Sequence, residues 1–480
     1  MTLTATQPHQ IYLAGEWVDS PDVLVIDNPA DPATPAGATY NATAEQVERA
    51  VEAAVAAFEQ TRVLPAYERA RALREISAGI KNRREELGRI LAIEAGKPVR
   101  DALAEIDRAV FTFRLAAEEA ERITGEVIPL DLMAASKGRV GITRRFPVGP
   151  VLGISPFNFP VNLAAHKIAP AIAAGCSIVL KPASKDPLAM LAVTEIIDSA
   201  GLPPGAVSVL PMTRELGDRL VPDERFKLLT FTGSPSVGWR MKERAGKKKV
   251  VLELGGNAGV IIDRTADLEW AVKRILVGGF SYAGQSCISV QRIFVHEAVA
   301  DAFRERLVAG VRGLTLGDPL DPATDLGPMV DRAAASRTER WVEEAVALGG
   351  RVLAGGHADG AYFEPTILEA VPATAQVCSN EAFAPLVVVF TFSDFGEAIR
   401  EVNDSLFGLQ TGVFTNDLAN AWRAFNELEV GGVILNDISS YRIDHMPYGG
   451  VKDSGLSREG LRWSIEDMTE LRLLVLAQPQ

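Results

Sequence analysis

The feature that most constrains the fold is a change of rhythm at Val148, after which short apolar segments alternate with stretches of helical periodicity. Strands that alternate with helices form βαβ units, which build a parallel sheet with helices on both faces. Two successive sets of strands are predicted, and the pair Gly255-Gly256 separates them. The first set comprises residues 151–154, 177–180, 206–210, 228–231 and 250–254. The second set comprises strands at 259–262, 292–295, 386–390, 411–414 and 433–436, with helices at 298–312, 332–348, 395–402 and 418–426. The sequence therefore predicts an α/β fold with two α/β domains.

The part of the chain before Val148 is predicted to be mostly helical. A short strand at 11–18 is followed by three amphipathic helices, at 47–58 behind the N-cap Thr43, at 65–95 and at 99–123. At the other end, residues 471–476 are apolar except for Arg472 and predict a last strand. Because it has no local partner, this strand is expected to pair with another chain or with a distant segment.

Composition and charge exclude several classes of function. The 480 residues contain 49 basic and 62 acidic side chains, a net charge of −13, which disfavours binding to nucleic acid or to an anionic membrane. Three cysteines cannot form a disulfide framework and indicate the reducing cytoplasm. Residues 1–10 lack the pattern of a signal peptide. Residues 146–165 carry no charge, but their four prolines exclude a membrane-spanning helix and indicate a buried strand and loop.

Cys287 is the candidate nucleophile. It follows Gly284 in a segment of small and polar residues, where a position near a helix N-terminus would favour the thiolate. The alternative is that Cys287 is a buried structural cysteine, as most single cysteines are. Cys176 precedes an apolar strand and is expected in the core, and Cys378 is also expected to be structural.

Two further polar residues follow predicted apolar strands. Glu253 is a lone carboxylate among valines and leucines, and it is either a general base at a ligand crevice or an edge residue in water. Asn158 follows the strand at 151–154, and its amide either donates to a developing oxyanion or stabilises a turn. In open parallel sheets, ligands bind beyond the carboxyl ends of the strands, which favours the functional alternative for both.

The same argument indicates a ligand site at Lys181, which ends the strand at 177–180, and at the strand-turn-helix 231–238, whose small residues suit a phosphate. The chain has no G-x-G-x-x-G, no P-loop and no G-x-S-x-G motif. Its five histidines are scattered, and we expect no metal site.

Seven segments, taken together and in this order, resemble the aldehyde dehydrogenase superfamily over nearly the whole chain. They are PFNFP at 156–160, LKPAS at 180–184, FTGSPSVG at 231–238, LELGG at 252–256, GQSC at 284–287, EAFAP at 381–385 and PYGGVKDSG at 447–455. The resemblance implies a Rossmann-like domain that binds NAD or NADP, an α/β catalytic domain and a small β oligomerisation element, in a homodimer or homotetramer. The expected boundaries are 1–123 with 148–254, then 255–451, and finally 124–147 with 467–480.

The resemblance also implies roles for individual residues. Cys287 attacks a small-molecule aldehyde, the Asn158 amide and the Cys287 backbone N–H hold the oxyanion, and Glu253 activates the water that hydrolyses the thioester. The residues implied in cofactor binding are Ser155, Phe157, Lys181, Ser184, Gly233, Ser234, Glu381 and Phe383. Ser184 replaces a glutamate that is common in NAD-preferring members, so NADP with its 2′-phosphate is permitted, and Lys185 is adjacent.

Two alternative activities remain at this point. A semialdehyde dehydrogenase that transfers the acyl group to CoA would resemble this pattern but lack the glutamate at Glu253, so hydrolysis is favoured. A cysteine hydrolase would need no nicotinamide, but it would need a histidine base near Cys287, and His166 is the best candidate.

The substrate prediction depends on three residues. In a helix after Pro160, Asn162 and His166 share a face with Asn158, and in the family this face lines the aldehyde tunnel. A polar face favours a small aldehyde that is polar or anionic. The loop 436–450 resembles that of lactaldehyde-type and non-phosphorylating glyceraldehyde-3-phosphate-type members, and its Arg442 is expected to meet a carboxylate or phosphate. The alternative is that Arg442 forms a surface pair with Asp444. Ser286, where some glyceraldehyde-3-phosphate enzymes carry an arginine, disfavours that particular substrate.

Overall fold

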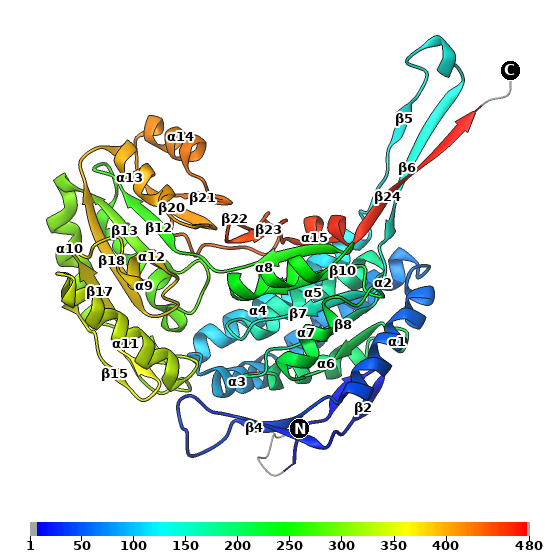
Figure 1. The fold of residues 1–480 in the computed structure, drawn as a ribbon, viewed down its shortest axis with the longest axis horizontal. Helices are drawn as coiled ribbons and strands as arrows, with labels where there is room; N and C mark the ends of the chain where they lie inside the picture. The colour runs from blue at the N-terminus through cyan, green and yellow to red at the C-terminus, as the bar shows by residue number, and fades with distance from the viewer. Residues whose placement is uncertain (1–6, 478–480) are drawn as a thin grey trace.

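The alternating segments form two separate sheets in a computed structural model that describes residues 7–477 (Figure 1). The first sheet has eight strands in the order β2-β1-β9-β8-β7-β10-β11-β23. Their bounds are β1 Ile11–Leu13, β2 Glu16–Val18, β7 Val151–Ile154, β8 Ile178–Lys181, β9 Val207–Val209, β10 Leu228–Thr232, β11 Lys249–Glu253 and β23 Gly455–Leu456. The five central strands are parallel, whereas β1 and β23 pair antiparallel at the two sides.

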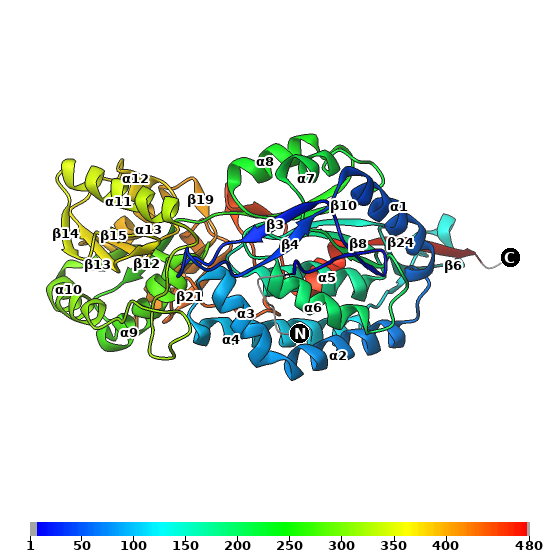
Figure 2. The ribbon, with the colours of Figure 1, turned by 90° about the horizontal axis from the view of Figure 1, so that it is seen from below.

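Helices cover both faces of the first sheet, as the continuous apolar strands require. One face of the sheet shares a core with helices α2 to α6. The other face packs on α1, α7 and α8 (Figure 2). The bounds are α1 Ala44–Thr61, α2 Ala66–Asn82, α3 Arg84–Ala95, α4 Val99–Ala120, α5 Pro160–Ala174, α6 Leu188–Asp198, α7 Arg214–Leu220, α8 Pro235–Arg244 and α15 Leu461–Asp467.

The second sheet has seven strands in the order β14-β17-β18-β13-β12-β20-β21, all parallel except β14. Helices α9 and α10 cover one face, and α11, α13 and α14 cover the other. The strands are β12 Ala258–Ile262, β13 Val290–His296, β14 Arg351–Ala354, β17 Thr366–Glu369, β18 Leu386–Phe392, β20 Gln410–Phe414 and β21 Gly432–Leu435. The helices are α9 Leu268–Phe280, α10 Glu297–Arg312, α11 Arg332–Ala347, α12 Gln376–Ser379, α13 Phe395–Asn403 and α14 Leu418–Glu427. The two predicted sets of parallel strands are thus confirmed.

A three-stranded antiparallel sheet, β5-β6-β24, projects away from both lobes (Figure 1). Its strands are β5 Val127–Pro129, β6 Arg139–Pro147 and β24 Thr469–Ala477. The predicted terminal strand therefore exists, and its partner in the monomer is the distant β6. Five of its apolar side chains remain about half exposed in one chain: Leu471, Leu473, Leu474, Val475 and Leu476.

Several helices begin and end where the sequence predicts. Thr43 caps α1 with a reciprocal capping box to Gln46, and Gly96 ends α3 in the left-handed region. The single helix predicted at 65–95 is wrong, because the chain breaks at Arg83, which leaves helical geometry while its guanidinium binds Glu86 and Glu195. The strand predicted at 11–18 is a hairpin, because Ala14 and Gly15 both have positive φ.

Shorter elements complete the described chain. They are η1 Ala134–Ser136, η2 Ser281–Gly284, and the small strand pairs β3 Asp22–Ile26 with β4 Gly37–Asn41, β15 Ala358–Asp359 with β16 Tyr362–Phe363, and β19 Phe407–Gly408 with β22 Val451–Lys452. Within residues 7–477, no helix has the length and apolar character needed to cross a membrane. The expectation about a signal peptide concerns residues 1–10, of which 1–6 lie outside the described residues, as do 478–480 at the other end.

Candidate active site

Four neighbouring parallel strands of the first sheet bring candidate residues to one edge. Ile154 at the end of β7 aligns with Lys181 on β8 and with Phe231 on β10, and Thr232 aligns with Glu253 on β11. Ser155, Lys181, Gly233 and Glu253 therefore stand at the carboxyl ends of adjacent strands, where open parallel sheets bind ligands.

Cys287 faces this edge from the other lobe. It lies in a turn between η2 and β13, so the expected position near a helix N-terminus is wrong. The turn approaches the first sheet so closely that a Cβ at Gly256 would collide with the Cys287 carbonyl oxygen. Burial raises the pKa of the Cys287 thiol to about 12, and Sγ lies 2.9 Å from the Tyr448 hydroxyl oxygen. The other two cysteines are buried, as predicted.

Asn158 stands between the end of β7 and the start of α5, and it is 5% exposed. Its Nδ2 donates to the carbonyl of Gln285, 3.1 Å away and two residues from the nucleophile. Its own carbonyl accepts from Lys97 Nζ at 2.7 Å. The amide thus reaches across to the loop of Cys287 and does not stabilise a local turn.

Glu253 ends β11 with its side chain buried, so the alternative of an edge residue in water is wrong. Neither carboxylate oxygen has a hydrogen-bond partner among the described residues. Burial, and then repulsion from Glu459, raise the pKa of Glu253 well above its ordinary value. A Cβ at Gly449 would stand 2.8 Å from its Oε1, so this glycine allows the loop to close over the carboxylate. A buried carboxylate without internal partners is available to a water molecule or a substrate.

Two ionisable side chains near the same edge, Lys181 and Glu381, also form few hydrogen bonds. Lys181 Nζ has only long contacts, 3.4 Å to the Pro182 carbonyl and 3.4 Å to the Ser184 hydroxyl, and burial lowers its pKa to about 8. Glu381 accepts from the Gly256 N–H at 2.9 Å, and burial raises its pKa to about 7. Both groups therefore fit the hydroxyls of a ribose, although no contact joins them to each other in the described structure.

The remaining predicted cofactor residues surround the same edge. Ser234 is the N-cap of α8 and makes no side-chain cap, which leaves the first turn of the helix open to a phosphate. The Ser155 hydroxyl is buried and unpartnered in the described part of the chain. Phe157 and Phe383 pack edge to face with ring centroids 5.7 Å apart. Gly233 approaches the Phe231 ring and donates its N–H to the Glu253 carbonyl at 3.1 Å. These residues fit a dinucleotide.

Two of the three predicted substrate residues, Asn162 and His166, are held by one buried aspartate. Asp444 accepts from Asn162 Nδ2 at 3.1 Å, lies 2.8 Å from His166 Nε2, and pairs with Arg108 through bonds of 2.6 and 3.1 Å. Despite its burial, the charge of Arg108 and the hydrogen bond with His166 hold the pKa of Asp444 well below its usual range. His166 Nε2 is thus engaged with Asp444, and the hydrogen-bond partner of the Cys287 thiol is Tyr448 and not the histidine that a cysteine hydrolase would need.

Arg442 is buried with its side chain 6% exposed, and it bonds Glu459 at 2.9 Å. Its guanidinium lies 3.7 Å from the centroid of the Tyr448 ring. The alternative of a surface pair with Asp444 is therefore wrong, because each of the two residues is buried with other partners. The Arg442 Nε is buried and has no hydrogen-bond partner among the described residues.

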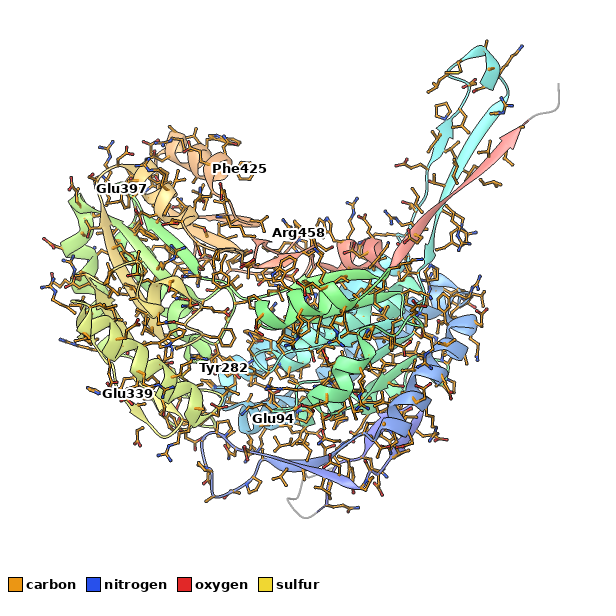
Figure 3. The ribbon with its side chains drawn as sticks, viewed as in Figure 1. Glu94, Tyr282, Glu339, Glu397, Phe425 and Arg458 are labelled. Atoms are coloured by element: carbon orange, nitrogen blue, oxygen red, sulfur yellow. The ribbon has the colours of Figure 1, made fainter. Side chains whose placement is uncertain are left out.

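Four charged residues next to the site were not predicted: the buried Lys97, Lys167 and Glu459, and the half-buried Arg108. Lys167 Nζ contacts the hydroxyls of Thr232 at 2.7 Å and Thr230 at 3.3 Å. It also lies 3.5 Å from Glu459. The one lysine in helix 160–174, which has no acidic residue to pair with it, is the signal that could have marked Lys167, whereas Glu459 offers none. Figure 3 shows Tyr282, whose ring packs on Lys97, between the two lobes.

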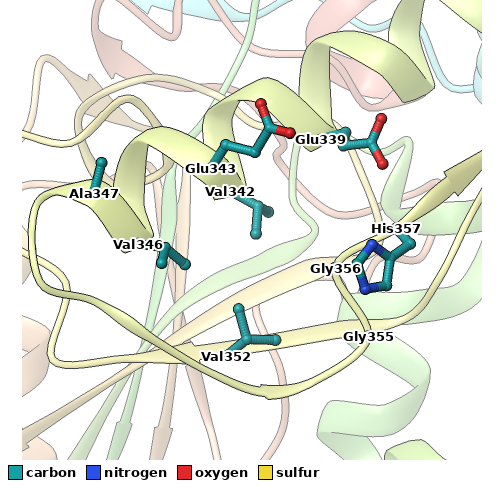
Figure 4. Close-up of a pocket in the computed structure, with 9 residues that line it drawn as sticks. All are labelled: Glu339, Val342, Glu343, Val346, Ala347, Val352, Gly355, Gly356 and His357. Atoms are coloured by element: carbon teal, nitrogen blue, oxygen red, sulfur yellow. The ribbon is translucent and has the colours of Figure 1, made fainter.

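Within residues 7–477, no three His, Cys, Asp or Glu side chains cluster as metal ligands would. An open groove of about 430 Å³ between α11 and β14 is shown in Figure 4, and none of the residues discussed above lines it. Its lining is Glu339, Val342, Glu343, Val346, Ala347, Val352, Gly355, Gly356 and His357.

A cysteine that faces an amide donor, a free carboxylate and a dinucleotide-binding edge defines an oxidoreductase that works through a thiol. The chain belongs to the aldehyde dehydrogenase family, whose model matches residues 17–474. It is thus an enzyme of the class that oxidises aldehydes to acids with NAD or NADP, as the resemblance implied.

Known relatives cover nearly the whole chain. A 3-sulfolactaldehyde dehydrogenase of Priestia aryabhattai is 44% identical over 476 residues, which are 99% of each chain. The crystal structure of aldehyde dehydrogenase 21 from Physcomitrella patens, in complex with the reaction product succinate, superposes with a TM-score of 0.96 at 48% identity and covers 98% of this chain and 99% of that one. A glyceraldehyde-3-phosphate dehydrogenase from Methanocaldococcus jannaschii complexed with NADP gives a TM-score of 0.90 at 40% identity, over 95% and 99%.

Proposed function

We propose that this enzyme oxidises a short aldehyde that carries an acidic group, and that it releases the free acid by hydrolysis. The observation that carries the hydrolytic step is Glu253, buried within the site with neither oxygen hydrogen-bonded in the described structure. A CoA-acylating enzyme would not need this base, since CoA and not water takes the acyl group.

The residues divide the reaction as follows. The Cys287 thiolate forms a C–S bond with the aldehyde carbon, and the carbonyl electrons move to oxygen, where the Asn158 amide and the Cys287 N–H stabilise the charge. When bound, NAD or NADP accepts the hydride that leaves this carbon as the carbonyl re-forms. Glu253 then takes a proton from water that attacks the resulting thioester, and the C–S bond breaks to restore the thiolate.

For the nucleotide, we assign Lys181 and Glu381 to the ribose hydroxyls, and Ser155, Gly233 and Ser234 to the pyrophosphate. Phe157 and Phe383 pack beside the nicotinamide. Ser184 leaves room for a 2′-phosphate, so both NADP and NAD are accepted. Solved relatives include complexes with each nucleotide. Lys185 pairs with Asp331 at 2.6 Å, and it would have to exchange this partner to reach a phosphate.

For the substrate, Arg442 supplies the positive charge, and Asn162 and His166 supply a polar wall. The unpartnered Arg442 Nε supports an anionic group, because a buried donor without a partner is costly. Two relatives point in the same direction: one is named for 3-sulfolactaldehyde, and the other was solved with succinate.

For assembly, we propose that β5, β6 and β24 are an oligomerisation element, with boundaries near 124–147 and 467–480. The exposed apolar side chains of β24 support this assignment, since a monomer rarely leaves such a patch in water. The nucleotide domain would comprise 1–123 with 148–254, and the catalytic domain 255–451. We expect a cytoplasmic homodimer or homotetramer.

The test is the initial rate of reduced nicotinamide formation with NAD and with NADP across matched aldehydes. The two anionic substrates, succinic semialdehyde and 3-sulfolactaldehyde, should exceed butyraldehyde and benzaldehyde in kcat/KM by at least tenfold. Lactaldehyde should also exceed butyraldehyde and benzaldehyde. The product should be the free acid, unchanged when CoA is added. Higher rates with uncharged aryl aldehydes would contradict the role of Arg442.

A further inference from the structure

The Tyr448 hydroxyl lies 2.9 Å from the Cys287 thiol, and the tyrosine is 2% exposed. We propose that Tyr448 is a catalytic residue whose hydroxyl donates a hydrogen bond to the Cys287 thiolate and thereby keeps the nucleophile reactive. The inference rests on the proposed function, in which Cys287 attacks the aldehyde. It assigns chemistry to the PYGGVKDSG segment, which the proposed mechanism otherwise leaves without a role.

The surroundings of Cys287 explain why the thiolate needs such a donor. The thiol lies in a turn, so no helix N-terminus stabilises its charge. Burial and the negative charges of Glu253 and Glu381 all disfavour ionisation. The Tyr448 hydrogen bond and the charge of Arg442 act in the opposite direction. A thiolate can only accept hydrogen bonds, so the tyrosine must be the donor once Cys287 has ionised.

Tyr448 is held firmly for this purpose. Its N–H donates to the Glu459 carbonyl at 3.0 Å, and the Glu459 N–H donates back at 2.6 Å. Ile288 and Leu409 pack with its ring beside Cys287 and limit access of water. A donor fixed by its backbone and its packing loses little entropy when it bonds the thiolate.

The positive charge of Arg442 strengthens the Tyr448 hydroxyl as a hydrogen-bond donor. Its guanidinium lies over the Tyr448 ring at 3.7 Å from the centroid, and Glu459 fixes it there at 2.9 Å. A cation against an aromatic face draws electron density from the ring, which makes the phenol a stronger donor. Glu459 in turn lies 3.5 Å from Lys167, so the charges behind the tyrosine are themselves paired.

The test compares Tyr448→Phe with the wild-type enzyme and with Tyr441→Phe, a matched control whose tyrosine is 44% exposed. The rate of Cys287 alkylation by iodoacetamide is measured from pH 6 to 10 without aldehyde or nucleotide, and mass spectrometry locates the adduct. In Tyr448→Phe the profile should move to higher pH, and the rate at pH 7.5 should fall about 10- to 100-fold, since hydrogen bonds to charged groups are the strong ones. Tyr441→Phe should match the wild type.

Single-turnover hydride transfer should slow in the same proportion in Tyr448→Phe, while the Kd for the nucleotide stays unchanged. A profile that superposes on the wild type, or faster alkylation in the variant, would overturn the proposal. If Tyr448→Phe does not fold, the substitution Tyr448→3-fluorotyrosine serves instead. Its more acidic phenol should move the alkylation profile to lower pH, and an unmoved profile would overturn the proposal as well.

The two proposals fail separately. The alkylation assay needs no aldehyde, so a shifted profile in an enzyme that oxidises none of the tested aldehydes would refute the proposed function alone. Turnover of aldehydes with identical wild-type and Tyr448→Phe alkylation profiles would refute only the role of Tyr448.

Discussion

Lys97 and Glu105 form an ion pair in which both side chains are fully excluded from solvent. Lys97 Nζ also donates to the Asn158 carbonyl at 2.7 Å. It packs between two aromatic rings, 4.1 Å from the centroid of Phe159 and 4.2 Å from that of Tyr282. We expect Lys97→Met, which keeps the unbranched apolar stem and removes the ammonium group, to damage both stability and activity.

The size of the stability loss depends on the hydrogen bonds that Glu105 keeps after Lys97 is replaced. Breaking a buried ion pair by removal of one partner costs about 3–5 kcal/mol, because the other charge stays buried. Glu105 Oε1 keeps two backbone donors, the N–H groups of Val161 and Asn162 at 2.9 and 3.1 Å. The loss should therefore lie near the lower end, about 3 kcal/mol. At roughly 2–4 °C per kcal/mol for a large domain, Tm should fall by about 6–12 °C.

Calorimetry at a fixed scan rate measures the shift, and the double variant Lys97→Met/Glu105→Gln is the control. Glutamine keeps the carbonyl that accepts from α5 but removes the stranded charge, so most of the lost Tm should return. Activity should stay low in both variants, since the Asn158 carbonyl has lost its donor in each. A double variant no more stable than the single one would refute the argument from the buried charge.

Two further predictions concern the chemistry. Glu253→Gln should slow thioester hydrolysis by about 10²- to 10⁴-fold, so that a burst of one reduced nicotinamide per Cys287 precedes a slow steady state, and stopped-flow absorbance checks this. In the wild type, burial and Glu459 raise the pKa of Glu253, so the rate of deacylation should increase with pH until that carboxyl is ionised. The Glu253→Gln variant should lose this pH dependence. Loss of turnover with no burst, when single-turnover hydride transfer is fast, would contradict the assignment of Glu253. Ser184→Glu should raise the KM for NADP at least tenfold through repulsion of the 2′-phosphate while the KM for NAD changes little, and equal effects on both nucleotides would contradict the position given to Ser184.

Local sequence predicted most of the framework. Continuous apolar runs gave nearly all central strands within one or two residues, because parallel strands covered on both faces leave no polar alternation to confuse the assignment. The same reasoning placed Lys181 and Glu253 at strand ends, where the structure has them. The N-cap Thr43 was also predicted correctly, since a cap acts through neighbours in the chain.

The contacts that decide the chemistry lie far apart in the sequence, which is why they were missed. Arg108 reaches Asp444 across 336 positions, and Tyr448 reaches Cys287 across 161. For Arg442 and Asp444, two residues apart, the sequence left open a surface pair as the alternative to an Arg442 that binds an anion. Each is instead buried against a partner that no local pattern reveals.

These distant contacts form two largely buried networks of ionisable groups. In one, Asp444 joins Arg108 to His166, and in the other Glu459 joins Lys167 to Arg442. Burying so many charges gains the fold little, because desolvation offsets most of the attraction. An apolar wall would hold the two lobes at least as well. Under the proposed function, these groups serve an anionic substrate and a thiol that must ionise near Glu253 and Glu381.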